Sequence, residues 1–299
     1  MNFADRLAAA VARRKSQLVL GLDPDPMRLL PDAIRSAGGA SPAERAGAAV
    51  ARHCELLVRL AGPACVGVKL QLACFERLGA AGWRAFEDVV ASSRDAGLIV
   101  IADGKRGDVP HTAAAYGQAF AGSTPTPWGN VNGFAVDALT VNPLLGRDAL
   151  EPIIDQARAV GAGTFVLVRT SNPGAQELQD SGTTPLREVL ARLVRELGES
   201  GVGESGLSDV GAVVGATRPD LVRSLRDAMP QTVFLLPGVG AQGGDVSALK
   251  EAFRPGPAAG LVAASRSIVD AAVDSGEPED ARAAAEHLRG AAWEVSGAS

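Results

Sequence analysis

Short apolar segments recur along the chain at a near-regular interval, and each is followed by polar or glycine-rich residues and then by a helical pattern. Their apolar character is nearly continuous rather than alternating, which is typical of parallel strands buried on both faces. The segments are Gln17–Leu22, Cys65–Leu70, Leu98–Ala102, Val136–Val141, Thr164–Val168, Val210–Gly215, Thr232–Leu236 and Ala259–Ala263. The pattern therefore predicts eight strands.

Between these segments the apolar spacing predicts amphipathic helices. The clearest is Ser41–Ala61, where Ser41, Pro42 and Glu44 match an N-cap, a first-turn proline and a capping box, and Gly62-Pro63 supplies the end. We expect the other helices at Phe75–Ala96, Thr112–Ala121, Arg147–Val160, Thr184–Leu197, Pro219–Ala228, Val246–Phe253 and Glu279–Trp293.

Eight strand–helix units in a chain of 299 residues predict an α/β fold of the (β/α)8 TIM-barrel type. We expect one domain over residues 1–299, with an extra N-terminal helix at Asn2–Lys15 closing the bottom of the barrel. The same alternation permits a doubly wound open sheet, but the GxGxxG motif usual after its first strand is absent. At that point the chain reads Asp23-Pro24-Asp25-Pro26.

Two connections are longer than a barrel needs, namely Pro24–Ala40 and the Gly/Pro/Thr/Asn-rich Gly122–Gly133. We expect both to be surface excursions. The second is a candidate cover or flank for the functional site.

Composition and charge exclude several classes of protein. No apolar run approaches the ~18 residues that span a bilayer, and the N-terminus lacks a signal-peptide block. The three cysteines and three histidines show no zinc or disulfide spacing, so we expect a soluble, cytoplasmic protein. A net charge of −5 argues against nucleic-acid binding. It leaves room for a small anionic ligand, because a local cluster of Lys and Arg can override the global sign.

Charged and polar residues follow the predicted strands, at the face where barrel enzymes carry their chemistry. Taken singly, each has a structural explanation: Asp23 can start a turn before Pro24, and Lys69 can be a strand end that reaches solvent. Many charges on one rim are costly unless they pair or meet a ligand, which favours a functional interpretation. The residues are Asp23, Lys69, Asp103, Lys105, Asp108, Asn142, Ser171, Gln242 and Arg266.

The densest cluster follows the third predicted strand. There we expect Lys105 to lie between the carboxylates of Asp103 and Asp108, which favour its charged form. Such a lysine is a poor Schiff-base nucleophile but a good positioned acid and a counter-charge to an anion forming beside it. We interpret Arg106 and His111 as flanking surface groups.

A second cluster follows the seventh and eighth strands. The segment Pro237–Asp245 contains four glycines, which let backbone N–H groups approach an anion, and a helix is expected to follow it. Arg266 lies in Ser265-Arg266-Ser267, which opens another expected helix. These two loops are the usual phosphate-binding pair of a barrel, so the sequence predicts a phosphate site here.

Together these motifs resemble the orotidine 5'-phosphate decarboxylase family, in its longer bacterial branch. The resemblance rests first on Asp103-x-Lys105-x-x-Asp108-Val109-Pro110-x-Thr112 and on Pro237-Gly238-Val239-Gly240-Ala241-Gln242-Gly243-Gly244-Asp245. It extends to Gly21-Leu22-Asp23, Val68-Lys69, Thr170-Ser171-Asn172-Pro173-Gly174 and Ser265-Arg266-Ser267. The chain departs from the pattern at Val109, where Ile is common, and at Gly122–Gly133, which shorter members lack.

The resemblance implies decarboxylation of orotidine 5'-phosphate to uridine 5'-phosphate in de novo pyrimidine biosynthesis, with no cofactor and no metal. It implies four catalytic residues, Lys69, Asp103, Lys105 and Asp108, with Lys105 protonating the ring carbanion. It implies that substrate is bound by Asp23, Thr112, Ser171, Val239, Gln242 and Arg266. The implied partner is a second copy of the chain, with Asp108 and Thr112 reaching across the dimer interface, and neither a nucleic acid nor a membrane.

Two alternatives stay open. A Mg²⁺-dependent sugar-phosphate decarboxylase or aldolase-type synthase of the same superfamily shares the Asp-x-Lys-x-x-Asp motif, but it carries an acid at the end of strand two. Here that position is Lys69, which repels a metal ion. A non-catalytic protein that binds nucleotide phosphates would need no charged array, so the four charged residues argue against it.

Overall fold

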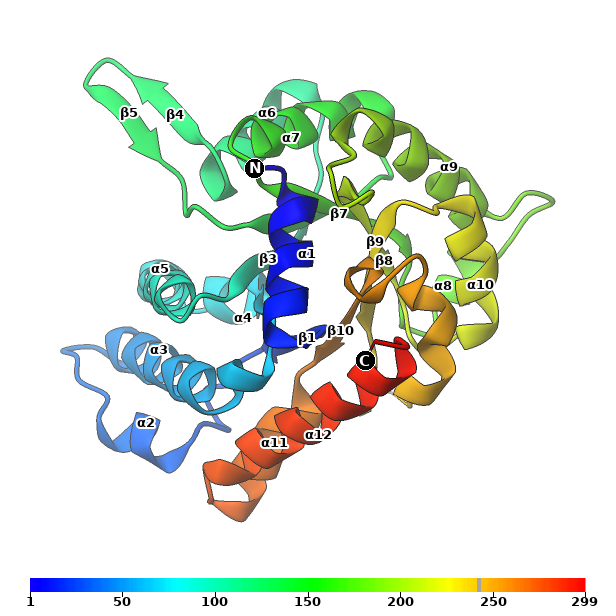
Figure 1. Ribbon diagram of the computed structural model, residues 1–299. Coiled ribbons are helices and arrows are strands. Elements are labelled where there is room, and N and C mark those ends of the chain that lie inside the picture. The colour runs from blue at the N-terminus through cyan, green and yellow to red at the C-terminus, as the bar shows by residue number, and fades with distance from the viewer. Residues whose placement is uncertain (241–242, 299) are drawn as a thin grey trace.

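The computed structural model describes residues 1–240 and 243–298, and its centre is a closed barrel of eight parallel strands (Figure 1). The strands are β1 (Leu18–Leu22), β2 (Gly67–Gln71), β3 (Ile99–Arg106), β6 (Ala138–Val141), β7 (Gly163–Arg169), β8 (Ser208–Val214), β9 (Thr232–Pro237) and β10 (Gly260–Ala264). They pair in the order β1-β10-β9-β8-β7-β6-β3-β2, which closes the sheet on itself. All eight predicted strands are confirmed, and the open sheet is excluded.

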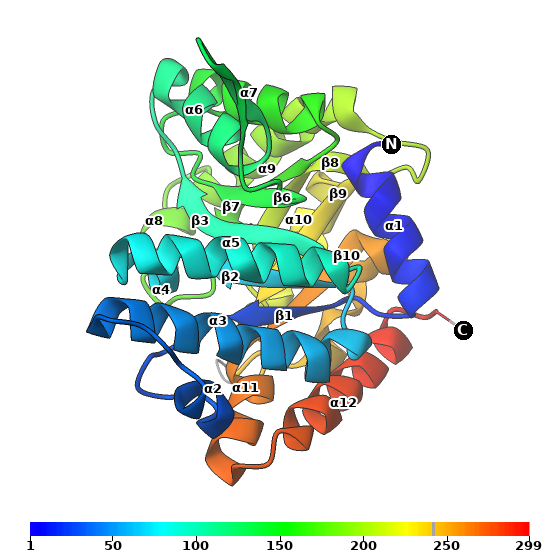
Figure 2. The same cartoon turned by 90° about the vertical axis from the view of Figure 1, so that its left-hand side faces the viewer.

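Helix α1 (Phe3–Arg14) closes one end of the barrel, as predicted (Figures 1 and 2). Its apolar face packs into the barrel with alternate residues of the strands, and the Phe3 ring meets Phe165 edge-on at 6.0 Å between centroids. The Arg6 guanidinium reaches Asp137 at 2.6 Å from Nη1 to Oδ1. This end is therefore filled by packing and leaves the opposite end, where the strands finish, for a site.

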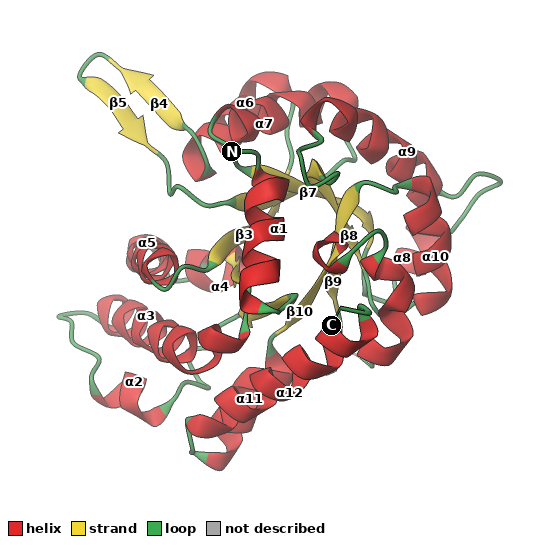
Figure 3. Cartoon of the chain, in the orientation of Figure 1, coloured by secondary structure: helices red, strands yellow, loops and turns green. Residues whose placement is uncertain are grey.

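The remaining helices form a ring around the strands (Figure 3). They are α2 (Pro31–Arg35), α3 (Pro42–Ala61), α4 (Leu72–Glu76), α5 (Gly79–Asp95), α6 (Pro110–Phe120), α7 (Arg147–Ala159), α8 (Ala175–Gln179), α9 (Leu186–Gly198), α10 (Pro219–Ala228), α11 (Arg266–Ser275) and α12 (Glu279–Val295). The predicted capping box is confirmed, since Glu44 N–H donates to Ser41 Oγ and Ser41 N–H donates to Glu44 Oε2. Within the described ranges, no helix has the length and apolar character needed to cross a membrane.

The structure corrects the prediction for some of the outer helices. The helix predicted over Phe75–Ala96 is two helices, α4 and α5, separated where Gly79 adopts a φ of +61°. Val246–Phe253 is a 3-10 helix, η3, instead of an α-helix. The helices α2 and α8 were not predicted, because five residues are too few to show a helical period.

The long connection Gly122–Gly133 is a two-stranded antiparallel hairpin of β4 (Ser123–Thr126) and β5 (Gly129–Asn132). It projects outward from the barrel, with Trp128 exposed at its tip (Figure 1). Its base lies between the end of α6 and the start of β6, at the end of the barrel that faces away from the strand C-termini. None of its residues lines the cavity described below, so the idea that it covers the site is wrong.

A buried arginine ties together the outer layer near β9. Arg226 on α10 is 2% exposed, and its guanidinium donates hydrogen bonds of 2.6 to 3.0 Å to the carbonyls of Met229, Thr232, Ala252 and Ala259. The same group lies 3.7 Å from the centroid of the Phe234 ring. One buried side chain therefore satisfies four backbone carbonyls from three segments of the outer layer and the barrel.

Replacing Arg226 with methionine is expected to lower the free energy of unfolding by about 3 kcal/mol or more, because several buried carbonyls lose their donors. The midpoint of urea unfolding measures the change. Arg223→Met on the same helix is the matched control, since Arg223 is exposed and, among the residues that the structure describes, forms an ion pair only with Glu251. Equal midpoints for the two variants would refute the role of Arg226.

Candidate active site

A cavity of about 380 Å³ opens at the C-terminal ends of the barrel strands. Its floor is apolar, formed by Val213, Leu235 and Ala263, and its walls carry charged and polar groups from the ends of β1, β2, β3, β7 and β10. Close contact between two strands shapes one wall. A Cβ added to Gly21 would lie 2.7 Å from Cβ of Ser265, so β1 approaches the end of β10 as only glycine allows.

Two lysines flank one buried carboxylate in this cavity. Asp103 on β3 accepts from Lys69 Nζ at 2.7 Å through Oδ2 and from Lys105 Nζ at 2.7 Å through Oδ1. Lys69 on β2 lies 3.6 Å from Oδ1 of Asp23, which follows β1. The result is a row of alternating charge, Asp23–Lys69–Asp103–Lys105, with Lys105 the most exposed member.

Burial and charge oppose each other in this row. Burial alone raises the pKa of Asp103, but the ammonium groups of Lys69 and Lys105 outweigh it and hold the pKa well below its ordinary 3.8. Burial alone lowers the pKa of Lys69, but the carboxylates of Asp103 and Asp23 outweigh it and raise the pKa above its ordinary 10.5. Both groups are ionised at neutral pH.

The signs of these shifts define a pH window for stability. The contribution of Asp103 is complete above its ordinary pKa of 3.8 and is lost as the pH falls through the lowered folded value. The contribution of Lys69 is complete below 10.5 and is lost as the pH rises through the raised folded value. Between these limits the two groups remain a paired, ionised unit.

Two polar residues that sequence analysis missed complete the hydrogen bonding of Asp103. Thr140 on β6 donates from Oγ1 to Oδ1 at 2.8 Å, and Gln71 at the end of β2 donates from Nε2 to Oδ2 at 3.4 Å. A signal existed for Gln71, because it lies two residues after Lys69 and so shares its face of the strand. The signal for Thr140 was weaker, because the sequence shows only a single hydroxyl residue within the apolar strand β6.

Three of the other predicted site residues line the same cavity. Ser171 follows β7, Val239 follows β9, and Arg266 begins α11. Asn142, named with them as a strand-end residue, lies outside the lining. Gln242, predicted to bind phosphate, lies outside the described residues.

The described glycines after β9 lie at the same end of the cavity as Arg266. Gly238 and Gly240 adopt φ values of +100° and +75°, and Gly244 N–H donates to the Gly238 carbonyl at 3.0 Å. A non-glycine residue is strained in this conformation. Because the segment and the first turn of α11 border the cavity together, this end is suited to an anion.

Asp108 and Thr112 do not join the cavity. Oδ1 of Asp108 accepts the backbone N–H of Val109 at 2.8 Å, and Thr112 is exposed on the first turn of α6. The prediction that Lys105 lies between Asp103 and Asp108 is therefore wrong within one chain. The lysine held between two carboxylates is Lys69, which lies between Asp23 and Asp103, and no residue of 106–112 lines the cavity.

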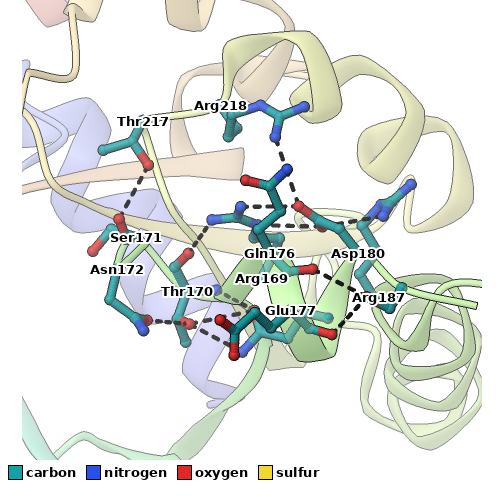
Figure 4. A network of polar contacts seen from close by, with 12 residues as sticks. Arg169, Thr170, Ser171, Asn172, Gln176, Glu177, Asp180, Arg187, Thr217 and Arg218 are labelled. Carbon is teal, nitrogen blue, oxygen red and sulfur yellow. Dashed lines mark hydrogen bonds and ion pairs between the residues drawn. The ribbon is translucent and has the colours of Figure 1, made fainter. Parts of the chain in front are cut away.

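An ion cluster centred on Asp180 anchors the loop after β7 (Figure 4). Asp180 pairs with Arg169 at 3.0 Å and with Arg187 at 3.1 Å, and Arg218 lies 3.6 Å away. The hydrogen bond from Arg169, followed by the charges of Arg169 and Arg187, lowers the pKa of Asp180 against the effect of burial. The cluster ties the segment that follows α8 to the barrel and to α9.

The same loop is fixed on its cavity side. Thr170 N–H donates to Oε1 of Gln179 at 2.8 Å, and Nε2 of Gln179 donates to Oγ1 of Thr170 at 3.0 Å. Thr217 donates to the Ser171 carbonyl at 3.3 Å (Figure 4). Residues 170–172, which line the cavity, are thereby held by hydrogen bonds from two directions.

The chemistry of this arrangement follows from its charges. Lys105 can place an ammonium beside a carboxylate that stays ionised, which suits proton donation to a developing anion. The described residues contain no group of three or more His, Cys, Asp or Glu side chains placed to hold a metal ion. The carboxylates Asp23 and Asp103 already have Lys69 between them, so a cation there would have to displace an ammonium.

Comparison with known proteins gives consistent matches. Residues 16–281 match the family model described as "Orotidine 5'-phosphate decarboxylase / HUMPS family". Orotidine 5'-phosphate decarboxylase of Rhodopirellula baltica is 42% identical over 275 residues, covering 90% of this chain and 88% of its own. That of Deinococcus radiodurans is 40% identical over 269 residues, covering 89% of each. The solved structure of Leishmania donovani OMP decarboxylase superposes with a TM-score of 0.76 at 29% identity, covering 100% of both chains.

Proposed function

Because this chain belongs to the orotidine 5'-phosphate decarboxylase / HUMPS family, we propose that its cavity binds orotidine 5'-phosphate and that Lys105 protonates the ring as CO₂ leaves. The reaction is the carboxy-lyase step that forms uridine 5'-phosphate in pyrimidine biosynthesis. The observation that carries the proposed roles is the row Lys69–Asp103–Lys105 at the cavity wall.

The chemical step breaks the bond between the ring and its carboxylate. CO₂ departs, the bonding electron pair stays on the ring carbon, and no conjugated carbonyl delocalises it as in an ordinary enolate. Stabilisation must therefore be electrostatic and fixed in advance. The Lys105 ammonium lies beside the forming carbanion and transfers a proton to it, while Asp103 lies beside the scissile carboxylate and Lys69 keeps Asp103 ionised.

The same array favours a decarboxylase over the metal-dependent alternative. The ammonium of Lys69 lies between the carboxylates of Asp23 and Asp103, which is the position that a divalent cation would have to occupy.

Purified protein should convert orotidine 5'-phosphate to equal amounts of CO₂ and uridine 5'-phosphate. Absence of turnover with this substrate would refute the proposed function.

The remaining cavity residues fit the other parts of the nucleotide. Asp23 and Lys69 would contact ribose hydroxyls, Ser171 would contact the pyrimidine edge, and Val239 would border the ring. Arg266, at the N-terminus of α11 beside the glycine-rich segment, would bind the phosphate, as would Gln242. Phosphate binding far from the reacting carbon can contribute to catalysis by fixing the substrate.

Arg266→Ala is expected to lower kcat/KM for orotidine 5'-phosphate by about 10- to 100-fold, because the variant loses a charge-assisted contact to the phosphate. Gln242→Ala should act in the same direction. Orotidine, which lacks the phosphate, is the internal control, and its slow turnover should change little. Steady-state kinetics with both substrates measure the difference, and equal losses would show that Arg266 does not bind phosphate.

A second copy of the chain would complete the site. Asp108 is half-buried, Thr112 is exposed, and neither lines the cavity of its own chain, so both could enter a partner's cavity. Apolar side chains are exposed in this part of the chain: Val109, next to Asp108, is 55% exposed. Leu144 and Leu145, in the loop after β6, are 70% and 46% exposed, and that loop meets β3 where Asn142 N–H donates to the Arg106 carbonyl at 2.7 Å. Such a patch is typical of an interface. We therefore place Asp108 and Thr112 in the site of the other protomer of a homodimer.

The chain would act as one catalytic domain over residues 1–299. Helices from both of its ends support this, since α1 fills the barrel bottom and α12 packs against α3 and β1. Cys54, Cys65 and Cys74 are free thiols, which suits a reducing compartment, and we assign the activity to the cytoplasm.

A further inference from the structure

A β-bulge shapes the end of β3. Its pairing with β6 shifts register between Ala102 and Arg106, so residues 103–105 lie opposite the single residue Thr140. Bulges next to active sites redirect side chains. This one brings Asp103 and Lys105 together, so that Lys105 Nζ reaches Oδ1 of Asp103 at 2.7 Å.

The bulge leaves Lys105 in a conformation that needs support. Its φ is +48°, in the left-handed region that side-chain-bearing residues rarely adopt, at a cost on the order of 1 kcal/mol. The Lys105 N–H donates to Oγ1 of Thr140 at 2.9 Å. The hydroxyl thus takes the place of a backbone acceptor where the register shifts.

The hydrogen bonds of Thr140 have fixed directions. A hydroxyl has one proton, and because Oγ1 accepts from Lys105 N–H, that proton is free to point at Oδ1 of Asp103, 2.8 Å away. The same Oδ1 accepts from Lys105 Nζ. Thr140 is 1% exposed, so water cannot easily replace its hydroxyl. The backbone and the ammonium of Lys105 are linked in one ring through Thr140 and Asp103.

We propose that Thr140 is a positioning residue for the proton donor, whose hydroxyl holds the backbone of Lys105 and the carboxylate of Asp103 in the relative placement that the reaction needs. The inference rests on the proposed role of Lys105. It gives Thr140 no contact with the reacting carbon and no part in proton transfer.

Thr140→Val keeps the side-chain shape and removes both hydrogen bonds. The kcat of this variant for orotidine 5'-phosphate should fall by about 10- to 100-fold, because the catalytic group is displaced. Its KM, and its Kd for uridine 5'-phosphate, should stay within about threefold of the wild-type values. Thr140→Ser keeps the hydroxyl and should retain kcat within about threefold. A role in packing alone would not separate kcat from KM or allow rescue by serine.

Thr164→Val is the matched control, because Thr164 is an equally buried strand residue on β7 whose hydroxyl finds no hydrogen-bond partner among the described residues. Its kcat should be unchanged. Thr140→Ala provides a second hydroxyl deletion if valine prevents folding. Unchanged kcat in the hydroxyl deletions, or a loss in Thr140→Ser as large as in Thr140→Val, would overturn the role of Thr140. Absence of turnover in the wild-type protein would instead overturn the proposed function.

Discussion

Replacing Lys105 with alanine is expected to lower kcat for orotidine 5'-phosphate by at least about 10⁴-fold, the largest loss of any single substitution in the cavity. The variant loses two contributions together: the proton donor, and the positive charge beside the forming carbanion. The Asp103 carboxylate also keeps only one of its two ammonium partners. Binding of uridine 5'-phosphate should remain measurable, because the phosphate and ribose contacts do not involve Lys105.

Single-turnover kinetics and calorimetric titration with product separate these effects. Lys250→Ala is the matched control, since it removes an exposed lysine of η3 outside the cavity and should leave kcat unchanged. A Lys105→Ala protein that keeps more than a few per cent of wild-type turnover would show that Lys105 is not the proton donor.

Mixing two inactive variants, Lys105→Ala and Asp108→Ala, is expected to restore about a quarter of wild-type activity. If Asp108 acts in the partner's site, a mixed dimer has one site with both residues intact and one with neither. Random exchange makes half of the dimers mixed, which gives one intact site in four for a two-fold symmetric dimer. Activity measured as a function of mixing ratio tests this.

A negative control for the mixing comes from the cavity itself. Lys69 and Lys105 contact the same Asp103 within one chain, so Lys69→Ala mixed with Lys105→Ala should restore nothing. If the first mixture also stays inactive after subunit exchange has been confirmed, Asp108 belongs to the site of its own chain.

The barrel could be predicted because its strands are buried on both faces. Segments such as Thr232–Leu236 are apolar throughout, and only a closed or covered parallel sheet accommodates them. The sequence also predicted that Asp23, Lys69 and Arg266 lie together, because parallel strands bring their C-terminal ends to one face of the barrel.

The details around β3 could not be predicted, because they depend on pairing between strands. A register shift leaves no mark on apolar periodicity, so the bulge at 103–105 and the contacts of Thr140 appear only in three dimensions. Counting along the chain also placed Asp108 beside Lys105, whereas in the structure Lys105 lines the cavity and Asp108 does not. The hairpin Ser123–Asn132 gave no strand signal, since its Gly, Pro, Thr and Asn residues are typical of loops.

Cofactor-free decarboxylation by the charged row is tested most directly by turnover in excess EDTA, followed as loss of orotate-ring absorbance and formation of uridine 5'-phosphate. The positions of Lys69, Asp103 and Lys105 predict a rate unchanged by EDTA and by later addition of Mg²⁺. No turnover in EDTA, or turnover that returns only when Mg²⁺ is restored, would contradict it.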